Sequence, residues 1–149
     1  MKPTPKGWPR LSGSVFYDDP RAAIDWLCAA FGFEVRLKVE GDGGSIVHSE
    51  ITFGEALLMV SGTGGPESWQ RLYASPQATG GKVTQALALF VDDVDAHHAR
   101  AVSTGAKVIR EPETSDYGDD YWVDRSYGAL DLEGHLWWFM QRIRDNVAR

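Results

Sequence analysis

Two stretches of the chain place apolar side chains at the spacing of one buried helical face. In the first, apolar residues recur every three or four positions between Ile24 and Phe31. Asp19 precedes this stretch in the position of an N-cap, and Gly32 follows it in the position of a left-handed stop. The pattern therefore predicts a helix between Asp19 and Gly32.

The second stretch repeats this arrangement. A similar stripe runs from Val94 to Val102, Asp92 or Asp93 can serve as the cap, and Gly105 as the stop. Counted from Asp92, the interval to the stopping glycine equals that of the first segment. We therefore expect two helices of one length that belong to two copies of one unit.

Strand-like runs surround both helices in the same order. They cover residues 11–17, 33–39, 45–53 and 55–60 in the first copy, and 83–91, 106–110, 125–132 and 135–140 in the second. Each copy is predicted to be β-α-β-β-β, with about seven extra residues within 111–124. We expect a single domain over 1–149, with module one at about 11–60 and module two at about 83–141. The glycine- and proline-rich residues 61–81 are the predicted linker, with a helical turn at 66–73.

Composition narrows the classes of function. A net charge of −6 argues against nucleic acid as a partner, because phosphate binding relies on lysine and arginine. No apolar run is long enough for a membrane span, and residues 1–10 contain three prolines and no apolar stretch, unlike a secretory signal. Cys28 is alone, so the chain cannot form an internal disulfide and a cytoplasmic location is expected.

The motifs, taken in order, resemble those of the vicinal oxygen chelate superfamily, which includes glyoxalase I, bleomycin-resistance proteins, fosfomycin-resistance enzymes and extradiol dioxygenases. The matching segments are 19–26 (DPRAAIDW), 31–33 (FGF), 90–96 (FVDDVDA), 105–108 (GAKV) and 131–137 (DLEGHLW), where Leu132 replaces a proline. The resemblance implies an α+β fold of two βαβββ modules whose curved mixed sheets surround a cavity. It also implies a homodimer.

Metal-dependent relatives place ligands on the first and fourth strands of the modules. Counting from the helix starts and turn glycines puts these positions at Gly13, Leu58, Ala86 and Trp138. None of these side chains is a metal ligand, and a shift of one residue brings no suitable set. We therefore expect neither a metal nor another cofactor.

A cavity without metal would be lined mainly by apolar and aromatic groups. Strand alternation places Leu58, Ala86, Trp138 and Met140 toward it, and the linker and the acidic segment add aromatic rings. The predicted ligand-binding residues are Tyr17, Leu58, Trp69, Ala86, Phe90, Trp122, Trp138 and Met140. The alternative is that these side chains fill a solid core.

Polar candidates for catalysis are few. His48 and Glu50 alternate on a predicted strand, so they are an acid–base pair or a polar pair at a solvent-facing edge. Arg125 could bind a ligand carboxylate. It ends the segment 116–125, in which four aspartates alternate with aromatic residues. This segment is either a lid over a cationic aromatic compound or a solvated acidic loop.

These observations favour a metal-free protein that binds a small aromatic or cationic molecule and is not an enzyme. One alternative is a metal-independent lyase or isomerase that acts on a small organic acid through His48, Glu50 or Arg125. A further alternative is a structural dimer with a filled core. A metal-dependent glyoxalase-type lyase or dioxygenase would require a different alignment of the four ligand positions.

Overall fold

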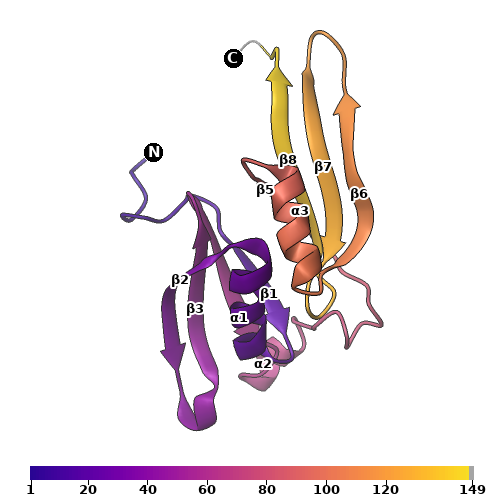
Figure 1. Ribbon diagram of the computed structural model, residues 1–149. Helices are drawn as coiled ribbons and strands as arrows, with labels where there is room; N and C mark the ends of the chain where they lie inside the picture. Colours follow the sequence, from indigo (N-terminus) through magenta and orange to yellow (C-terminus); the bar gives the residue numbers. More distant parts are fainter. Residues whose placement is uncertain (148–149) are drawn as a thin grey trace. The chain divides into compact units, whose positions relative to one another are not determined.

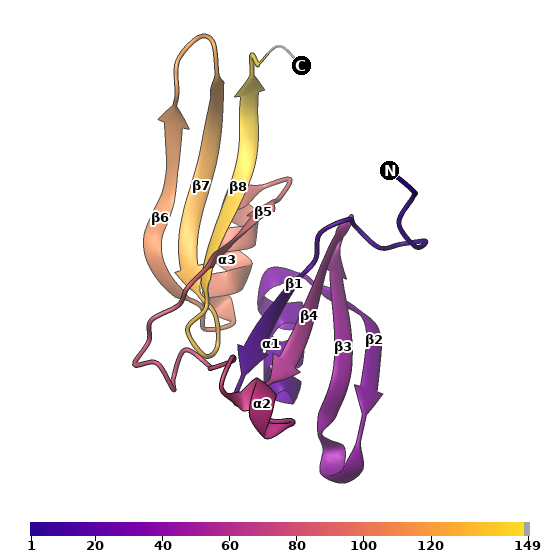
Figure 2. The same ribbon diagram turned by 180° about the vertical axis from the view of Figure 1, so that it is seen from behind.

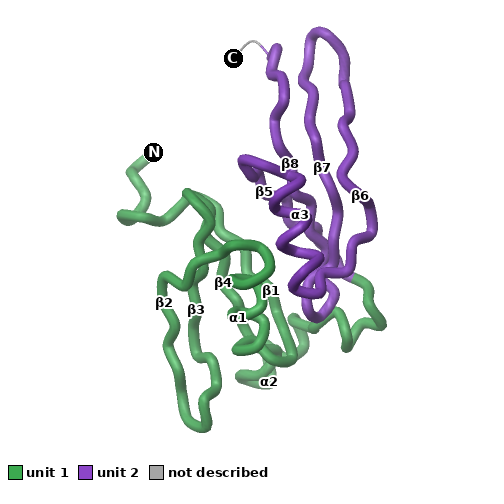
Figure 3. Tube along the Cα trace, in the orientation of Figure 1, with its two compact units in different colours: residues 1–82 green, residues 83–149 purple. Residues whose placement is uncertain are grey.

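A computed structural model describes residues 1–147 and shows two compact units, residues 1–82 and 83–147 (Figures 1 and 3). Each unit consists of a four-stranded mixed sheet and a helix that packs against one face of that sheet. The predicted β-α-β-β-β order is present in both units. The α+β fold class is therefore confirmed. No helix within residues 1–147 combines the length and the apolar character that a bilayer crossing needs.

The first unit has the strand order β1-β4-β3-β2, in which β1 pairs in parallel with β4 and the other pairs are antiparallel. Its elements are β1 (Gly13–Tyr17), α1 (Pro20–Phe31), β2 (Glu34–Glu40), a 3-10 turn (Asp42–Gly44), β3 (Ile46–Phe53), β4 (Ala56–Gly62) and the single-turn helix α2 (Glu67–Gln70). The helix α2 lies within the segment where the sequence predicts a helical turn.

The second unit has the equivalent order β5-β8-β7-β6, with β5 parallel to β8. Its elements are β5 (Ala86–Phe90), α3 (Val94–Ser103), β6 (Lys107–Asp116), β7 (Trp122–Leu130) and β8 (Leu136–Asp145). The extra residues of this copy lengthen the β6–β7 hairpin. The acidic and aromatic segment 116–125 therefore consists of the end of β6, the turn at 117–121 and the start of β7.

The two helices have the predicted caps but different lengths. Asp19 Oδ1 accepts the backbone N–H of Ala22 at 3.0 Å, and Asp93 Oδ1 accepts that of Ala96 at 3.0 Å. The first helix has 12 residues and the second has 10, so the expectation of equal lengths is wrong. α3 begins one residue later because Asp93, and not Asp92, is its N-cap, and it ends one residue earlier because Thr104, and not Gly105, is its C-cap. The two copies therefore align one residue away from the alignment that the glycines suggest.

Each sheet has a face covered by its helix and a second face, which we call the open face (Figure 2). In the first unit Val15, Tyr17, Ile51 and Val60 are fully buried on the side of α1. In the second unit Tyr127, Trp137 and Phe139 occupy the corresponding core with α3. Because strand side chains alternate between faces, the residues between these positions belong to the open faces.

Candidate functional site

The open face of the first unit carries a different set of residues from the one that the sequence predicts. Tyr17 is fully buried and Leu58 is 6% exposed, and both belong to the core beneath α1. Their placement on a cavity wall is therefore wrong. The error is one residue in register, which moves a strand's whole set of side chains to the other face. Ser14 and Phe16, with their cross-strand partners Met59 and Ser61, take these places.

The corrected register does not create a set of metal ligands. On the first unit it replaces Gly13 and Leu58 by Ser14 and Met59, a hydroxyl and a thioether, which do not bind a hard divalent ion on their own. Within residues 1–147, no three His, Cys, Asp or Glu side chains are grouped so that they could hold a metal ion. These residues do not fit the metal site of metal-dependent relatives, and a metal-free site stays a prediction.

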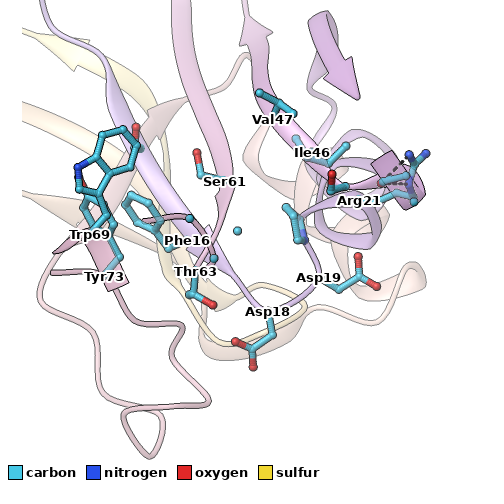
Figure 4. A pocket seen from close by; sticks show the side chains of 18 residues that line it. Phe16, Asp18, Asp19, Arg21, Ile46, Val47, Ser61, Thr63, Trp69 and Tyr73 are labelled. Atoms are coloured by element: carbon cyan, nitrogen blue, oxygen red, sulfur yellow. Dashed lines mark hydrogen bonds between the residues drawn. The ribbon is translucent and has the colours of Figure 1, made fainter. Parts of the chain in front are cut away.

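A pocket of about 780 Å³ lies in the first unit, at the end of the open face where β1 and β4 finish (Figure 4). One wall is aromatic. The Phe16 and Tyr73 rings are stacked, with centroids 3.9 Å apart and planes 11° apart, and Trp69 of α2 lines the same wall. Trp69 thus lines this pocket with a side chain that is 57% exposed, and its part in ligand binding stays a prediction. Phe16 and Tyr73 were not among the predicted residues.

The rest of the pocket is polar and rich in glycine. Asp18 and Asp19 line its lower side in Figure 4, and Ser61 and Thr63 contribute hydroxyl groups. Arg21 bounds the pocket at the side opposite the aromatic wall, where its guanidinium donates to the Gly44 carbonyl oxygen at 2.9 Å. The pocket therefore combines an aromatic wall, carboxylates and hydroxyl groups.

The Arg21 side chain is also held by an ion pair. Its Nη2 lies 2.9 Å from Glu40 Oε1, and Lys38 Nζ lies 3.2 Å from the same oxygen. Hydrogen bonds from Lys38 and Arg21 lower the pKa of Glu40. These contacts join the start of α1 to the β2–β3 turn and so fix that side of the pocket.

His48 and Glu50 form the predicted pair. His48 Nε2 and Glu50 Oε1 are 3.0 Å apart, and the Glu50 side chain is 7% exposed while that of His48 is 39% exposed. Glu50 Oε2 also lies 3.3 Å from Arg36 Nε of β2, which the sequence analysis did not single out. Arg36 in turn donates to the Gly7 carbonyl oxygen and lies 5.6 Å from the Trp8 ring. We call Arg36, His48 and Glu50 the polar cluster.

Arg125, the third predicted catalytic residue, lies elsewhere. It belongs to the second unit and forms a bidentate pair with Asp95 of α3, at 2.8 Å from Nε to Oδ2 and 2.6 Å from Nη2 to Oδ1. The hydrogen bond to Asp95 raises the pKa of Arg125 and that from Arg125 lowers the pKa of Asp95. Its side chain extends toward the helix that covers the sheet, and not onto the open face with Asp124 and Ser126.

The open face of the second unit matches the predicted register. One row across the sheet consists of Ala88, Trp138, Gly128 and Arg110, which are register partners on β5, β8, β7 and β6. A second row contains Phe90 and Met140, and Ala86 lies opposite Leu136. The predicted residues Ala86, Phe90, Trp138 and Met140 therefore share one face.

Trp122 joins this face through an arginine that the sequence analysis did not single out. The Arg142 guanidinium carbon lies 5.0 Å from the Trp122 ring and 5.4 Å from the Phe90 ring. Arg142 also pairs with Asp124, at 2.5 Å, and with Asp145, at 3.0 Å. The Asp124 hydrogen bond raises the pKa of Arg142. The positive charge of Arg142 is thus neutralised by carboxylates of the same unit.

Two βαβββ units, each with one helix-covered face and one open face, define the paired-module fold of the vicinal oxygen chelate class. The chain belongs to the glyoxalase/bleomycin resistance protein/dioxygenase superfamily, whose family model matches residues 11–139. The resemblance proposed from the motifs is therefore confirmed.

Comparison with individual proteins supports this membership. The crystal structure of TioX from Micromonospora sp. ML1 is 32% identical, with a TM-score of 0.68 over 89% of this chain and 95% of that chain. An uncharacterised protein of Mycobacterium bovis is 30% identical over 92% of this chain and 86% of its own length. TnmS3, an antibiotic binding protein from Streptomyces sp. CB03234, is 22% identical, with a TM-score of 0.61 over 88% of this chain and 93% of its own, and shows a shared fold.

Proposed function

We propose that this chain is a metal-free protein that binds a small aromatic or cationic organic molecule without transforming it. The observation that carries the proposal is the pocket of the first unit, which has a volume of about 780 Å³ and a wall formed by Phe16, Tyr73 and Trp69. Pockets of about 300–1,000 Å³ suit ligands of drug size. The volume and the aromatic wall both favour a ring-containing ligand.

The carboxylates of the pocket favour a ligand that carries a positive charge. Asp18 and Asp19 line it, and the Arg21 guanidinium is paired with Glu40. An amine on the ligand would gain from the carboxylates and from contact with the aromatic faces. TnmS3 supports the proposal at the level of the fold, because a protein of this architecture is described as binding an antibiotic.

A binding screen with matched variants tests the proposal. Aromatic amines are titrated against the protein by calorimetry, and we expect micromolar binders whose affinity falls about tenfold, or ~1.4 kcal/mol, in Trp69→Ala and Tyr73→Ala. Leu72→Ala is the control, because Leu72 is adjacent in sequence, 73% exposed and not part of the pocket wall. A screen without binders, or binders equally tight in all three variants, would refute the pocket as the binding site.

The polar cluster supports a second candidate, a metal-independent lyase or isomerase that acts on a small organic acid. A carboxylate that orients a half-exposed imidazole is an arrangement used in general base catalysis. The hydrogen bond between His48 and Glu50 is the observation that favours it.

This candidate predicts turnover of a bound organic acid, measured by mass spectrometry of the incubated compound. Product formation should be lost in His48→Gln and reduced in Glu50→Gln, while calorimetry shows that the compound still binds. If an active preparation retains its full rate in His48→Gln, the polar cluster is not catalytic.

We also propose that the protein is a homodimer and works in the cytoplasm. The edge strand β2 supports self-association, because Val35, Leu37 and Val39 on it are between 41% and 48% exposed. The single cysteine supports a reducing compartment.

A further inference from the structure

The open face of the second unit surrounds Trp138 with small residues. In its row across the sheet, Trp138 has Ala88 on one side and Gly128 on the other. A Cβ atom on Gly128 would stand 2.8 Å from Cζ3 of the indole and 3.1 Å from Cε3 and Cη2. The six-membered ring of Trp138 therefore occupies space that is available only because residue 128 has no side chain.

An arginine completes this row. Arg110 is the register partner of Gly128 on β6, and its guanidinium carbon lies 5.6 Å from the centre of the Trp138 ring. Strand alternation also places Arg142 of β8 on this face, and Arg144 follows it two positions later. Arg142 is neutralised by two aspartates, one of which is buried, and Arg144 Nη2 lies 3.1 Å from Asp116 Oδ1. Among residues 1–147, Arg110 pairs only with the exposed Glu113, with Nη2 and Oε2 3.3 Å apart.

The guanidinium of Arg110 also has an unused donor. Its Nε is buried, and no acceptor among residues 1–147 lies within hydrogen-bond reach of it. Leaving a buried N–H without an acceptor is unfavourable, and a charged donor makes stronger hydrogen bonds than a neutral one. A ligand that brings an acceptor to this point would remove that cost.

From these contacts we infer that Trp138 and Arg110 form a subsite for a planar aromatic group that carries a carboxylate or a similar anionic acceptor. The ring of the ligand stacks on the indole, and its acceptor receives hydrogen bonds from the guanidinium. The Trp138 ring lies over Gly128, and the small side chain of Ala88 on its other side leaves room for a flat group. This inference rests on the proposed small-molecule function and names a ligand class for the second unit.

Three probes separate ring, charge and shape: naphthoate, naphthylmethylammonium and cyclohexanecarboxylate. Each is titrated into the protein labelled at the indole nitrogens, and the Nε1–H signal of Trp138 is assigned with Trp138→Phe. We expect naphthoate to shift this signal and to bind at least tenfold more tightly than either other probe. The planar cation lacks the acceptor, and the saturated acid cannot stack.

Arginine variants test the role of the guanidinium. Arg110→Gln should weaken naphthoate binding about tenfold or more and leave naphthylmethylammonium unchanged. Arg71→Gln is the matched control, because Arg71 is an exposed arginine of the first unit that pairs with an exposed glutamate, Glu67. Unchanged amide spectra and unfolding midpoints confirm that both variants are folded.

The same spectra distinguish failure of this inference from failure of the proposed function, because Trp69 reports on the pocket of the first unit. If aromatic amines shift Trp69 but naphthoate does not shift Trp138, the proposed function stands and the subsite is refuted. Equal naphthoate affinity in Arg110→Gln, or equal affinity for naphthylmethylammonium at Trp138, also refutes the subsite. If no compound shifts either indole, both are refuted.

Discussion

At the scale of single residues, position 128 needs a glycine because there is no room for a side chain, and not because of its backbone angles. It is not among the glycines with positive φ, so another residue could adopt its backbone angles. Its replacement would instead collide with Trp138 on the neighbouring strand. A glycine inside a strand is otherwise unfavourable. The position therefore links the stability of the second sheet to the placement of the Trp138 indole on its open face.

Gly128→Ala should lower the free energy of unfolding by about 1–3 kcal/mol, because the added methyl group overpacks against the indole. Urea denaturation measures this change. In a Trp138→Ala background the same substitution should be close to neutral, since the colliding ring is gone. An equal cost in both backgrounds would contradict the contact with Trp138.

At the scale of elements, the N-caps of the two helices determine how the two copies align. Asp93 caps α3, and this fixes the register by which β5 corresponds to β1. The sequence offers two adjacent aspartates at this point, and each would satisfy the same local rule. Choosing Asp92 instead of Asp93 shifts the alignment of the two copies by one residue. Core positions of one copy are then matched with open-face positions of the other.

Asp93→Ala should therefore destabilise the protein by about 1 kcal/mol, as loss of an N-cap does, and Asp19→Ala should cost a similar amount. The control is Asp92→Ala, whose carboxylate does not cap α3. Thermal or chemical unfolding of the three variants checks the assignment. A larger effect at Asp92 than at Asp93 would restore the alignment that the glycines suggest.

The sequence predicted those parts of the fold that depend on local chemistry. Helix caps, turn glycines and strand patterns are read from neighbouring residues, and both β-α-β-β-β units follow from them. The His48–Glu50 pair was found for the same reason, since alternate strand residues share a face. The stacking of Phe16 on Tyr73 and the approach of Arg110 to Trp138 join residues far apart in sequence. Such contacts depend on the path of the linker and on strand order, which local patterns do not determine.

The packing of α3 on its sheet gives a pH prediction. Tyr127 of β7 is fully buried, and its hydroxyl lies 2.6 Å from His97 Nδ1. Burial raises the pKa of Tyr127 above its usual value of about 10. The neutral phenol is therefore favoured in the folded state. Its contribution to stability is complete below pH of about 10 and is lost progressively as the pH rises above that value.

Tyr127→Phe should cost about 1 kcal/mol at neutral pH through loss of the hydrogen bond. Above pH of about 10 its deficit relative to the wild type should shrink, because phenylalanine has no proton to lose. Urea denaturation at neutral and alkaline pH measures both effects. Tyr117→Phe, at a tyrosine that is 53% exposed, should show no such convergence. A deficit for Tyr127→Phe that is constant with pH would contradict the raised pKa.

At the scale of the whole molecule, the family fold does not determine the ligand. The superfamily description itself covers glyoxalases, resistance proteins and dioxygenases, so function must be argued from the two open faces. These faces differ chemically. The first has carboxylates beside aromatic rings, whereas the second has an arginine beside an indole. Binding measurements on the separate signals of Trp69 and Trp138 are therefore more informative than measurements of total fluorescence.

Self-association is the second property at this scale. Sedimentation of the full chain should show a dimer, and Leu37→Lys on the edge strand β2 should weaken it, because a charge on an edge opposes pairing with another chain. Leu72→Lys, which adds the same charge at another exposed leucine, is the control. A monomer at all concentrations, or an equal effect of both substitutions, would contradict the role of β2.

The contacts of Arg36 have a practical consequence for anyone who prepares this protein. Its guanidinium is shared between Glu50, the Gly7 carbonyl oxygen and the ring of Trp8. If residues 1–8 are removed, or if a fusion partner pulls them away, Arg36 loses its contacts with Gly7 and Trp8. Arg36 is then less constrained beside Glu50, and the orientation of His48 is loosened. Inactivity or weak binding of such a preparation would reflect the loss of the contacts made by residues 1–8, and not a property of the polar cluster itself.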